Sequence, residues 1–403
     1  MQNGDSRMPD FEARPIDYLL VKVAARCNIN CTYCYWFRDA SVYEKPKLMS
    51  AAVADKLLLR VEEQIISQSL SGFMMLLHGG EPMLWGVRNV RRLGDGCRAI
   101  TERTSKPVTL AITTNGLLID EEWLQCFLDY KISVTLSIDG PAHIHDQQRR
   151  TFQGGPTHAK VEHAMNLLQS RSIPFGVLAV CDPSREPAEY VDYFAKAGID
   201  GYDIMFPDAT WDDHPPSIAK FYCDLFDLWL EANRTKKTIE LRSIEAMLTG
   251  LLGGNSQTEA IGYGPVEVCT VLTDGSLEPL DTLRITGEGA TRASTNIFDN
   301  AIEDIKRDPR WQAARQASID LCETCQACPY MHACGGGYLP HRYSKDNGYD
   351  NPNAYCADLV KIFEHMQAEL GDRIYVRKPN GQQLPIREAA SAANASASLA
   401  SGL

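Results

Sequence analysis

From residue 17 onward, short runs of β-branched and other apolar residues alternate with longer stretches in which apolar positions recur every three or four residues. The short runs predict strands and the longer stretches predict amphipathic helices. The candidate strands are Tyr18 to Val23, Phe73 to Leu77, Thr109 to Thr113, Ser133 to Ser137, Phe175 to Val180 and Gly201 to Met205, and the clearest helices between them are Ala52 to Ser67, Glu121 to Leu128 and Val161 to Gln169. Alternating strands and helices form parallel sheets. The pattern therefore predicts an α/β fold, a TIM-like partial (β/α)6 barrel over residues 17–214, with an N-terminal extension before it.

The periodicity becomes purely helical after Pro215. Ile218 to Asn233 and Ile239 to Leu252 are apolar at helical spacing, and we expect residues 215–261 to bridge to a second module. That module, residues 262–372 with a closing helix, is rich in Cys, Gly and Pro, so ligation of metal clusters is expected to hold it together. Residues 373–403 are dominated by Ala and Ser towards their end and predict a flexible tail.

Charge and composition exclude several classes of protein. The 403 residues carry a formal net charge of −12, which argues against a nucleic-acid partner because phosphate binding requires concentrated Lys and Arg. The apolar runs are too short to cross a membrane, and residues 1–15 lack the basic start and apolar stretch of a signal peptide. The chain is therefore expected to be cytoplasmic.

Thirteen cysteines are many for the reducing cytoplasm, where structural disulfides are rare. Cys27, Cys31 and Cys34 follow the first predicted strand in a C-x3-C-x2-C arrangement. Three thiolates at these spacings can bind three irons of a four-iron cluster and leave the fourth iron open to a small molecule. Zinc is the alternative, although structural zinc normally takes four protein ligands.

The stretch AARCNINCTYCYW, with Tyr33 just before the last cysteine, resembles the signature of the radical S-adenosylmethionine (SAM) superfamily. The resemblance implies that SAM binds the open iron of a [4Fe–4S] cluster and that Tyr33 packs near the adenine. Gly79, Gly80, Glu81 and Pro82 follow the second strand and are similar to the family's GGEP motif, which receives the SAM amino group. An ordinary turn is the alternative interpretation of these four residues.

Two further residues resemble positions in peptide-modifying radical SAM enzymes. Ser137 and Arg149 match residues that help to hold the ribose and the carboxylate of SAM. A hydroxyl and a guanidinium are suitable donors for those groups. Capping of a strand end and a surface ion pair are the alternatives.

The second module resembles the SPASM domain of radical SAM peptide maturases, including its CGGG turn. Cys325, Cys328, Cys334 and Cys356 supply four thiolates, enough for a closed auxiliary [4Fe–4S] cluster, and zinc is again the alternative.

The module departs from the SPASM pattern at two positions. Leu280 and Tyr338 stand where two ligands of a first auxiliary cluster are expected, and only Cys269 and Cys322 remain as candidate ligands for such a cluster. At least one auxiliary cluster is therefore expected, and a second stays open.

Asp281 matches the acidic residue that sulfatase maturases use as a general base, provided that burial raises its pKa; a turn residue is the alternative. The stretches HRYS and YDNPNAYC resemble SPASM enzymes that join an aromatic ring to a nearby side-chain carbon in ribosomally made peptides, forming three-residue cyclophanes.

The resemblance thus implies a cross-linking enzyme that acts on a precursor peptide and receives electrons from a donor such as flavodoxin or ferredoxin. Three alternatives stay open. They are a formylglycine-generating sulfatase maturase, a peptide epimerase or thioether synthase, and a non-catalytic iron–sulfur electron carrier or redox sensor.

Overall fold

The computed structural model describes residues 11, 13–235, 239–256, 258–371, 375–377 and 383–385. Most of the predicted extension and tail therefore lies outside the described residues. The strands are β1 Tyr18–Ala24, β2 Asn30–Cys31, β3 Phe73–Gly79, β4 Val108–Thr114, β5 Ser133–Ser137, β6 Arg149–Arg150, β7 Phe175–Val180, β8 Gly201–Met205, β9 Glu240–Leu241, β10 Cys269–Val271, β11 Leu277–Glu278, β12 Tyr375–Arg377 and β13 Gln383–Pro385.

Helices flank or connect these strands. The α-helices are α1 Ala51–Ser67, α2 Val87–Thr104, α3 Glu121–Tyr130, α4 Ala142–Gln148, α5 His158–Ser170, α6 Pro187–Lys196, α7 Ala219–Arg234, α8 Arg242–Leu251, α9 Pro309–Ile319, α10 Glu323–Gln326, α11 Met331–Cys334 and α12 Cys356–Leu370. The 3-10 helices are η1 Tyr35–Arg38, η2 Ala40–Tyr43, η3 Pro82–Trp85, η4 Trp211–Asp213, η5 Asp281–Thr286, η6 Ile302–Arg307 and η7 Leu339–Arg342.

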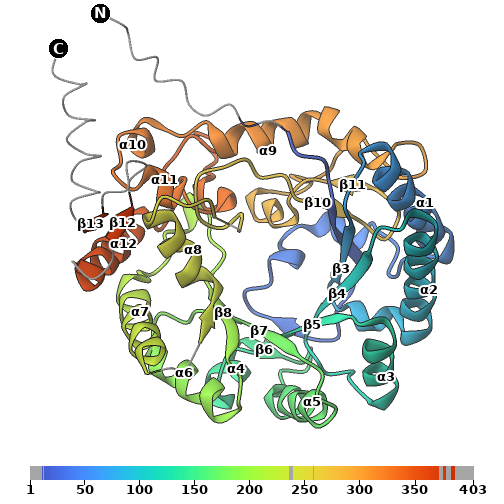
Figure 1. The fold of residues 1–403 in the computed structure, drawn as a ribbon, viewed down its shortest axis with the longest axis horizontal. Coiled ribbons are helices and arrows are strands. Elements are labelled where there is room, and N and C mark those ends of the chain that lie inside the picture. The colour runs from blue at the N-terminus through green and yellow to red at the C-terminus, as the bar shows by residue number, and fades with distance from the viewer. Residues whose placement is uncertain are drawn as a thin grey trace, which may run out of the picture.

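One curved sheet forms the centre of the molecule, in the strand order β11-β10-β1-β3-β4-β5-β7-β8-β9. All pairs from β10 to β9 are parallel, and only β10 and β11 are antiparallel. The crossover helices lie on the outer side of the sheet. The sheet curves into a ring whose two edge strands do not pair, so the barrel is open (Figure 1). Since the strands of a parallel sheet end at one edge, the loops after β1, β3, β4, β5 and β8 meet there.

The sequence accounts for much of this barrel. All six predicted strands are present, because parallel strands covered on both faces read as short runs of apolar, β-branched residues. Side-chain caps begin two of the helices as well. Ser50 accepts the N–H of Val53 at the start of α1, and Asp120 accepts that of Trp123 at the start of α3.

One predicted helix is partly wrong. Ile239 to Leu252 reads as a continuous helix, but Glu240 and Leu241 form β9 and pair with β8, and the helix α8 begins only at Arg242. Two strand residues do not visibly interrupt a helical apolar pattern. The pairing of β9 with β8 in the folded sheet therefore sets where the helix begins.

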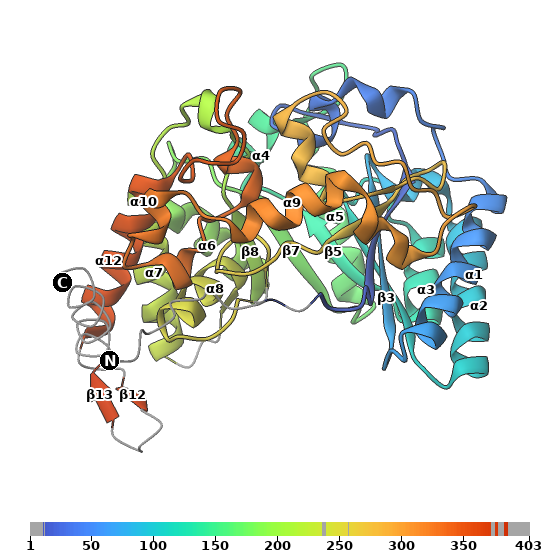
Figure 2. The same ribbon diagram turned by 90° about the horizontal axis from the view of Figure 1, so that it is seen from above.

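The cysteine-rich module closes the ring. β10 pairs with β1 in parallel, with Leu19 opposite Cys269, so the module begins as part of the barrel sheet. The segment from α9 to α11 then runs from the β11 edge back towards α8, on the side where the ring is open (Figures 1 and 2). In the part of the chain described here, no helix is both long and apolar enough to span a membrane.

Candidate functional site

The loop with the first three cysteines leaves β1 at the edge where the strands end. Cys31 lies in β2 opposite Arg149 of β6, and the backbone N–H of Cys34 donates to the carbonyl of Cys31 at 3.3 Å. Burial raises the pKa of the Cys27 thiol, and Glu81 and the other two thiols add to this rise. The fold therefore brings Cys27, Cys31 and Cys34 together, as their spacing predicted.

Two glycines allow the turn after β3 to lie against this loop. The N–H groups of Gly80 and Glu81 donate to the carbonyls of Ala24 and Arg26 at 2.9 and 3.0 Å. A Cβ on Gly80 would lie 2.3 Å from the carbonyl oxygen of Arg26 and 2.8 Å from the nitrogen of Cys27. The Gly-Gly-Glu-Pro segment is thus more than an ordinary turn, because it holds the cysteine loop in place.

Glu81 is buried, and donors of the chain itself occupy its carboxylate. Oε1 accepts from the Met83 N–H at 2.9 Å and the Thr114 hydroxyl at 2.7 Å, and Oε2 accepts from the Asn115 N–H at 2.8 Å. Burial raises the pKa of Glu81 to about 7 despite these donors. The carboxylate therefore fixes the turn after β4, a role that the resemblance did not indicate.

Asn115 is a site residue that the sequence analysis missed. Its side-chain amide donates to Asn28 Oδ1 at 2.7 Å and contacts Cys27 Sγ at 3.8 Å. The motif Thr-Thr-Asn-Gly after a strand was the available signal, but only the structure shows that the amide reaches a cysteine sulfur.

Arg149 forms a buried ion pair, so the alternative of a surface ion pair does not hold. Its Nε and Nη2 donate to the two oxygens of Asp139 at 2.9 and 3.2 Å, and the Arg149 side chain is 9% exposed and that of Asp139 1%. Tyr33 donates its hydroxyl to Asp139 at 2.5 Å and lies beneath the guanidinium, 5.4 Å from ring centroid to Cζ. Ser137 is the last residue of β5 and is half-buried at the same edge.

The second group of cysteines surrounds a cavity. A cavity of about 230 Å³ has Cys325, Cys328, Cys334 and Cys356 in its wall, together with apolar side chains such as Leu359 and Phe363. Gly335, Gly336 and Gly337 all have positive φ, and a Cβ on Gly335 would lie 2.1 Å from the carbonyl oxygen of Gly262. The four predicted ligands thus face one space, and this donor set fits an auxiliary four-iron cluster.

The remaining predicted ligands do not come together around a further space. Cys269 lies in β10 within the main core, and burial, with Glu303, raises the pKa of its thiol. Cys322 is hydrogen-bonded to Cys325.

Leu280 and Tyr338, the residues in place of the two expected thiolates, pack in one small apolar cluster around Val266, Leu283 and Leu339. Apolar side chains therefore occupy the region in which the two expected thiolates would lie.

No zinc arrangement is apparent. Within the described ranges, no group of three or more His, Cys, Asp or Glu side chains is placed to hold a single metal ion. Zinc requires its ligand atoms at about 2.0–2.3 Å from one centre, whereas a four-iron cluster binds each thiolate at a different iron.

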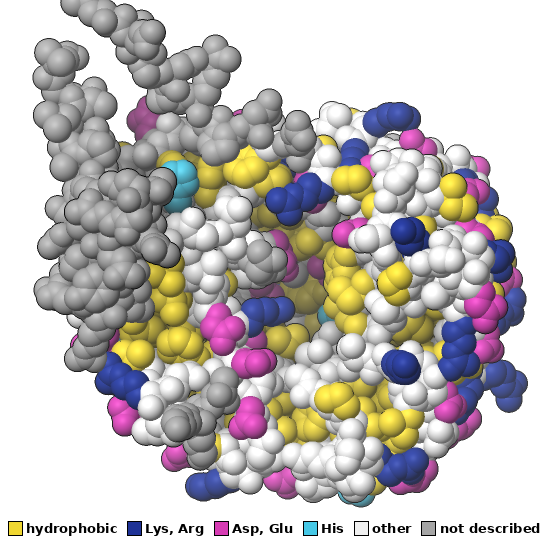
Figure 3. Space-filling model, in the orientation of Figure 1, with side chains coloured by type: hydrophobic (Ala, Val, Ile, Leu, Met, Phe, Trp, Pro, Cys, Tyr) yellow, Lys and Arg dark blue, Asp and Glu magenta, His cyan; other side chains and the backbone are white. Residues whose placement is uncertain are grey.

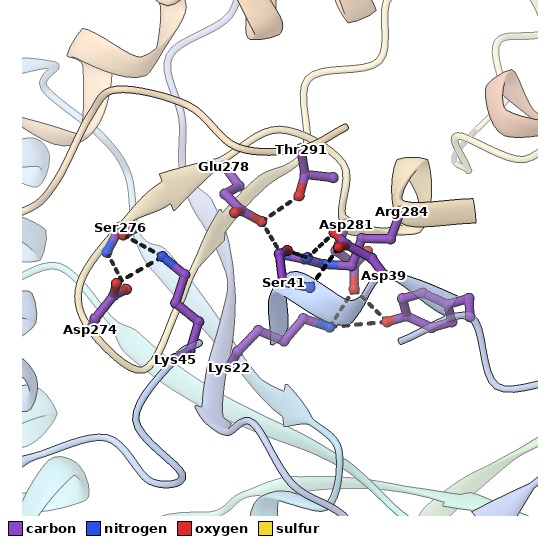
Figure 4. Close-up of polar contacts among 11 residues, drawn as sticks. Lys22, Asp39, Ser41, Lys45, Asp274, Ser276, Glu278, Asp281, Arg284 and Thr291 are labelled. Atoms are coloured by element: carbon purple, nitrogen blue, oxygen red, sulfur yellow. Dashed lines mark hydrogen bonds and ion pairs between the residues drawn. The ribbon is translucent and has the colours of Figure 1, made fainter. Parts of the chain in front are cut away.

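Asp281 is buried and belongs to a network of charged side chains (Figure 4). Its Oδ2 accepts hydrogen bonds from Lys22 Nζ and from the Tyr35 hydroxyl. Burial alone would raise the pKa of Asp281, but Lys22 and His78 hold it below its usual value. The condition stated for a general base, a pKa raised by burial, is therefore not met, and Asp281 is a buried carboxylate held ionised by its neighbours. Figure 3 shows the ring hollowed at its centre, with charged side chains around the opening.

Comparisons with known proteins agree with this arrangement. Residues 21–197 match the family model described as the radical SAM superfamily. The cysteine-type anaerobic sulfatase-maturating enzyme of Clostridium perfringens (strain 13) is 26% identical over 372 residues, covering 87% of this chain and 96% of the relative. The serine-type enzyme of Bacteroides thetaiotaomicron is 23% identical over 385 residues, covering 88% and 90%. The structure called native anSMEcpe with bound AdoMet and Cp18Cys peptide has a TM-score of 0.78 and 25% identity, covering 88% and 97%.

Proposed function

We propose that the chain is a radical SAM enzyme that modifies a peptide by removing a hydrogen atom from one of its carbons, because residues 21–197 match the family model of the radical SAM superfamily. The match supports the resemblance to the radical SAM superfamily that the cysteine motif indicated. The relatives described above are sulfatase maturases and not cyclophane-forming enzymes, so the comparisons leave the type of product open. The cofactors are SAM and [4Fe–4S] clusters.

The proposal depends most on the two groups of cysteines. Three thiols at the strand ends suit a cluster with one open iron, and four thiols around one cavity suit a closed cluster. When bound, SAM and a reduced four-iron cluster supply a carbon radical that can remove hydrogen from an unactivated C–H bond. The closed cluster is suited to accept an electron, and a small electron carrier such as flavodoxin or ferredoxin would reduce the first one.

Residues at the edge of the sheet are proposed to hold SAM. Tyr33, Ser137 and Arg149 follow or end strands whose carboxyl ends meet, and Gly79, Gly80, Glu81 and Pro82 form the turn beside the cysteine loop. Because Asp139 binds both the Arg149 guanidinium and the Tyr33 hydroxyl, these two side chains are oriented together before a ligand arrives. The occupied carboxylate of Glu81 indicates that its part is to shape the turn.

We favour an intramolecular cross-link, from an aromatic ring to a nearby side-chain carbon, as the product. The supporting observation is the apolar cluster of Leu280 and Tyr338, which replaces two thiolates that a sulfatase maturase is expected to need. After a carbon radical has added to a ring, the ring must lose one proton and one electron. Asp281, ionised at neutral pH, is the proposed proton acceptor and the closed cluster the proposed electron acceptor.

The test is anaerobic incubation of the reconstituted enzyme with SAM, dithionite and a peptide encoded beside its gene. Cross-linking predicts a loss of two hydrogens and no fragment ions between the joined residues. An unchanged peptide mass with inverted stereochemistry would instead indicate epimerisation.

Formylglycine formation is the second candidate, because the similarity to sulfatase maturases covers most of the chain. Oxidation of serine to formylglycine also removes two hydrogens, so mass alone does not separate the two products. A hydrazide probe does, since it captures the aldehyde of formylglycine and leaves a carbon–carbon cross-link unlabelled.

A further inference from the structure

Lys22 is a fully buried lysine to which the proposed function assigns no role. It lies in the middle of β1, and its side chain is 0% exposed. Removing an ammonium group from water is costly unless it is paired and hydrogen-bonded. Its presence inside the barrel therefore requires specific partners.

The ammonium of Lys22 has three N–H donors, and three acceptors on neighbouring residues surround it. Nζ lies 3.0 Å from the Tyr35 hydroxyl of η1 and 3.1 Å from His78 Nδ1 of β3, and it also donates to Asp281 Oδ2 of η5. The ring of Trp36 packs against the ammonium, 4.8 Å from Nζ to the centroid. Each donor thus meets an acceptor from a different element.

His78 connects this group to the turn beside the cysteine loop. Its Nδ1 also accepts from the N–H of Gly79 at 2.9 Å. Burial and Lys22 lower the pKa of His78 to about 3, so that the ring is neutral and can serve as an acceptor. Lys22 consequently joins the Gly79 turn and the Asp281 carboxylate in one network.

The two hydrogen bonds to Asp281 reach the same oxygen. Both Lys22 and Tyr35 donate to Oδ2, and the described residues offer no hydrogen bond to Oδ1. The carboxylate is therefore fixed at one oxygen while the other remains for a further partner.

We propose that Lys22 is a positioning residue that fixes Asp281 by Oδ2, so that Oδ1 accepts the proton released from the peptide. The inference rests on the proposed role of Asp281. Lysine suits this place because its three donors point in different directions, whereas the planar guanidinium of arginine does not match acceptors from three elements.

Several ionisable groups face this pair. Tyr18, Tyr35, His78 and Tyr338 lie near Asp281, and Arg284 and Cys34 lie near Lys22. Of these, Lys22 contributes the largest favourable charge to the ionised form of Asp281. Loss of Lys22 should therefore make Asp281 easier to protonate.

A nearby ion pair provides the control. Lys45 donates to Asp274 at 2.8 Å and to Ser276 at 3.1 Å, and so also ties the N-terminal loops to the second module (Figure 4). This pair is partly exposed and does not touch Asp281. Lys45→Met thus removes a similar link between the two parts of the chain without altering the carboxylate.

The first readout needs no peptide. The carboxylic-acid infrared band that Asp281→Asn removes is followed against pH in the reconstituted enzyme and in Lys22→Met and Lys45→Met. Lys22→Met should bind the proton about tenfold more tightly, a shift of about one pH unit, and Lys45→Met should match the wild type. No shift in Lys22→Met, or an equal shift in both variants, overturns the inference.

The second readout compares product formed per SAM cleaved, and includes Lys22→Arg in case Lys22→Met does not fold. Both Lys22 variants should lose product at least tenfold while still cleaving SAM. Product at the wild-type level in either folded variant overturns the positioning role. If the wild type modifies no peptide, the proposed function fails, and the infrared titration alone still decides whether Lys22 holds Asp281 ionised.

Discussion

Asp139 connects three parts of the candidate site, although the sequence analysis assigned it no role. It accepts from the Arg149 guanidinium and the Tyr33 hydroxyl, and its Oδ1 also accepts from the N–H of Val180 at 3.0 Å. A buried carboxylate with these donors fixes the side chains that are proposed to hold SAM.

Replacing Asp139 by asparagine should be strongly destabilising. Arg149 would remain buried without a counter-charge, and breaking such a pair costs about 3–5 kcal/mol. Denaturant unfolding of the apoprotein measures the change. The exposed pair between Asp55 and Arg92 is the control, because Asp55→Asn should cost no more than about 1 kcal/mol. Equal effects of the two substitutions would contradict the importance of the buried pair.

A second prediction at this scale concerns pH. His145 is fully buried, accepts from the Asp139 N–H at Nδ1 and contacts the Thr157 hydroxyl at 3.0 Å through Nε2. Burial, with Arg149, lowers the pKa of His145 to about 4. Below about pH 6.5 the unfolded chain binds a proton here that the folded chain does not bind until about pH 4, so stability should fall as the pH drops through this range.

The expected loss is about 3 kcal/mol between pH 7 and pH 4. Denaturant unfolding of wild type and His145→Gln at several pH values isolates this contribution, which the variant should lack. His163→Gln removes an exposed histidine from α5 and serves as the control. A wild-type pH dependence that persists in His145→Gln would show that other groups cause it.

The predicted site residues that the structure brings together are those with a local motif. The three cysteines of the first loop come together, and so do the four of the second module, because turns and short helices bring residues that are near in sequence close in space. The contacts of Asn115, Asp139 and Lys22 could not be predicted, since most of their partners are distant in the sequence.

At the scale of elements, the turn between β3 and η3 is the segment whose backbone position is most tightly fixed by its contacts. The N–H groups of Gly80 and Glu81 hold the cysteine loop, and the Glu81 side chain holds the turn after β4. Strands β3 and β4 were predictable from their apolar runs, but their coupling to the cysteine loop depends on contacts across the sheet.

Gly80→Ala tests this coupling. Because the new Cβ would lie 2.3 Å from a backbone oxygen, the turn must move away from the cysteine loop. We expect the variant to lose the iron of the first site and keep that of the second, or about four of eight irons per chain. Gly264→Ala, which meets nothing within 4 Å, is the control and should retain both clusters. Full iron content in Gly80→Ala would mean that the close approach is not required.

At the scale of the whole molecule, the second module completes the barrel through β10, which lies beside β1. The sequence analysis did not include β10, because three residues without a periodic pattern carry no strand signal. The helical bridge was expected from its spacing, whereas the pairing of β9 with β8 depends on the assembled sheet.

The apolar cluster of Leu280 and Tyr338 predicts the number of iron–sulfur clusters. With that region filled by side chains, the reconstituted wild type should bind about eight irons per chain, four for each of two clusters. Iron and sulfide analysis with Mössbauer spectroscopy measures this number. A content near twelve irons would require a third cluster and would contradict the conclusion that Cys269 and Cys322 do not bind one.

The central claim is that Cys27, Cys31 and Cys34 bind a cluster with one iron left open for SAM. The most direct measurement is the release of 5′-deoxyadenosine from SAM by the anaerobically reconstituted enzyme with dithionite. The wild type should release it, and a variant with alanine at all three cysteines should release none while it keeps the iron of the second module. Equal release by that variant, or no release by a fully reconstituted wild type, would contradict the account.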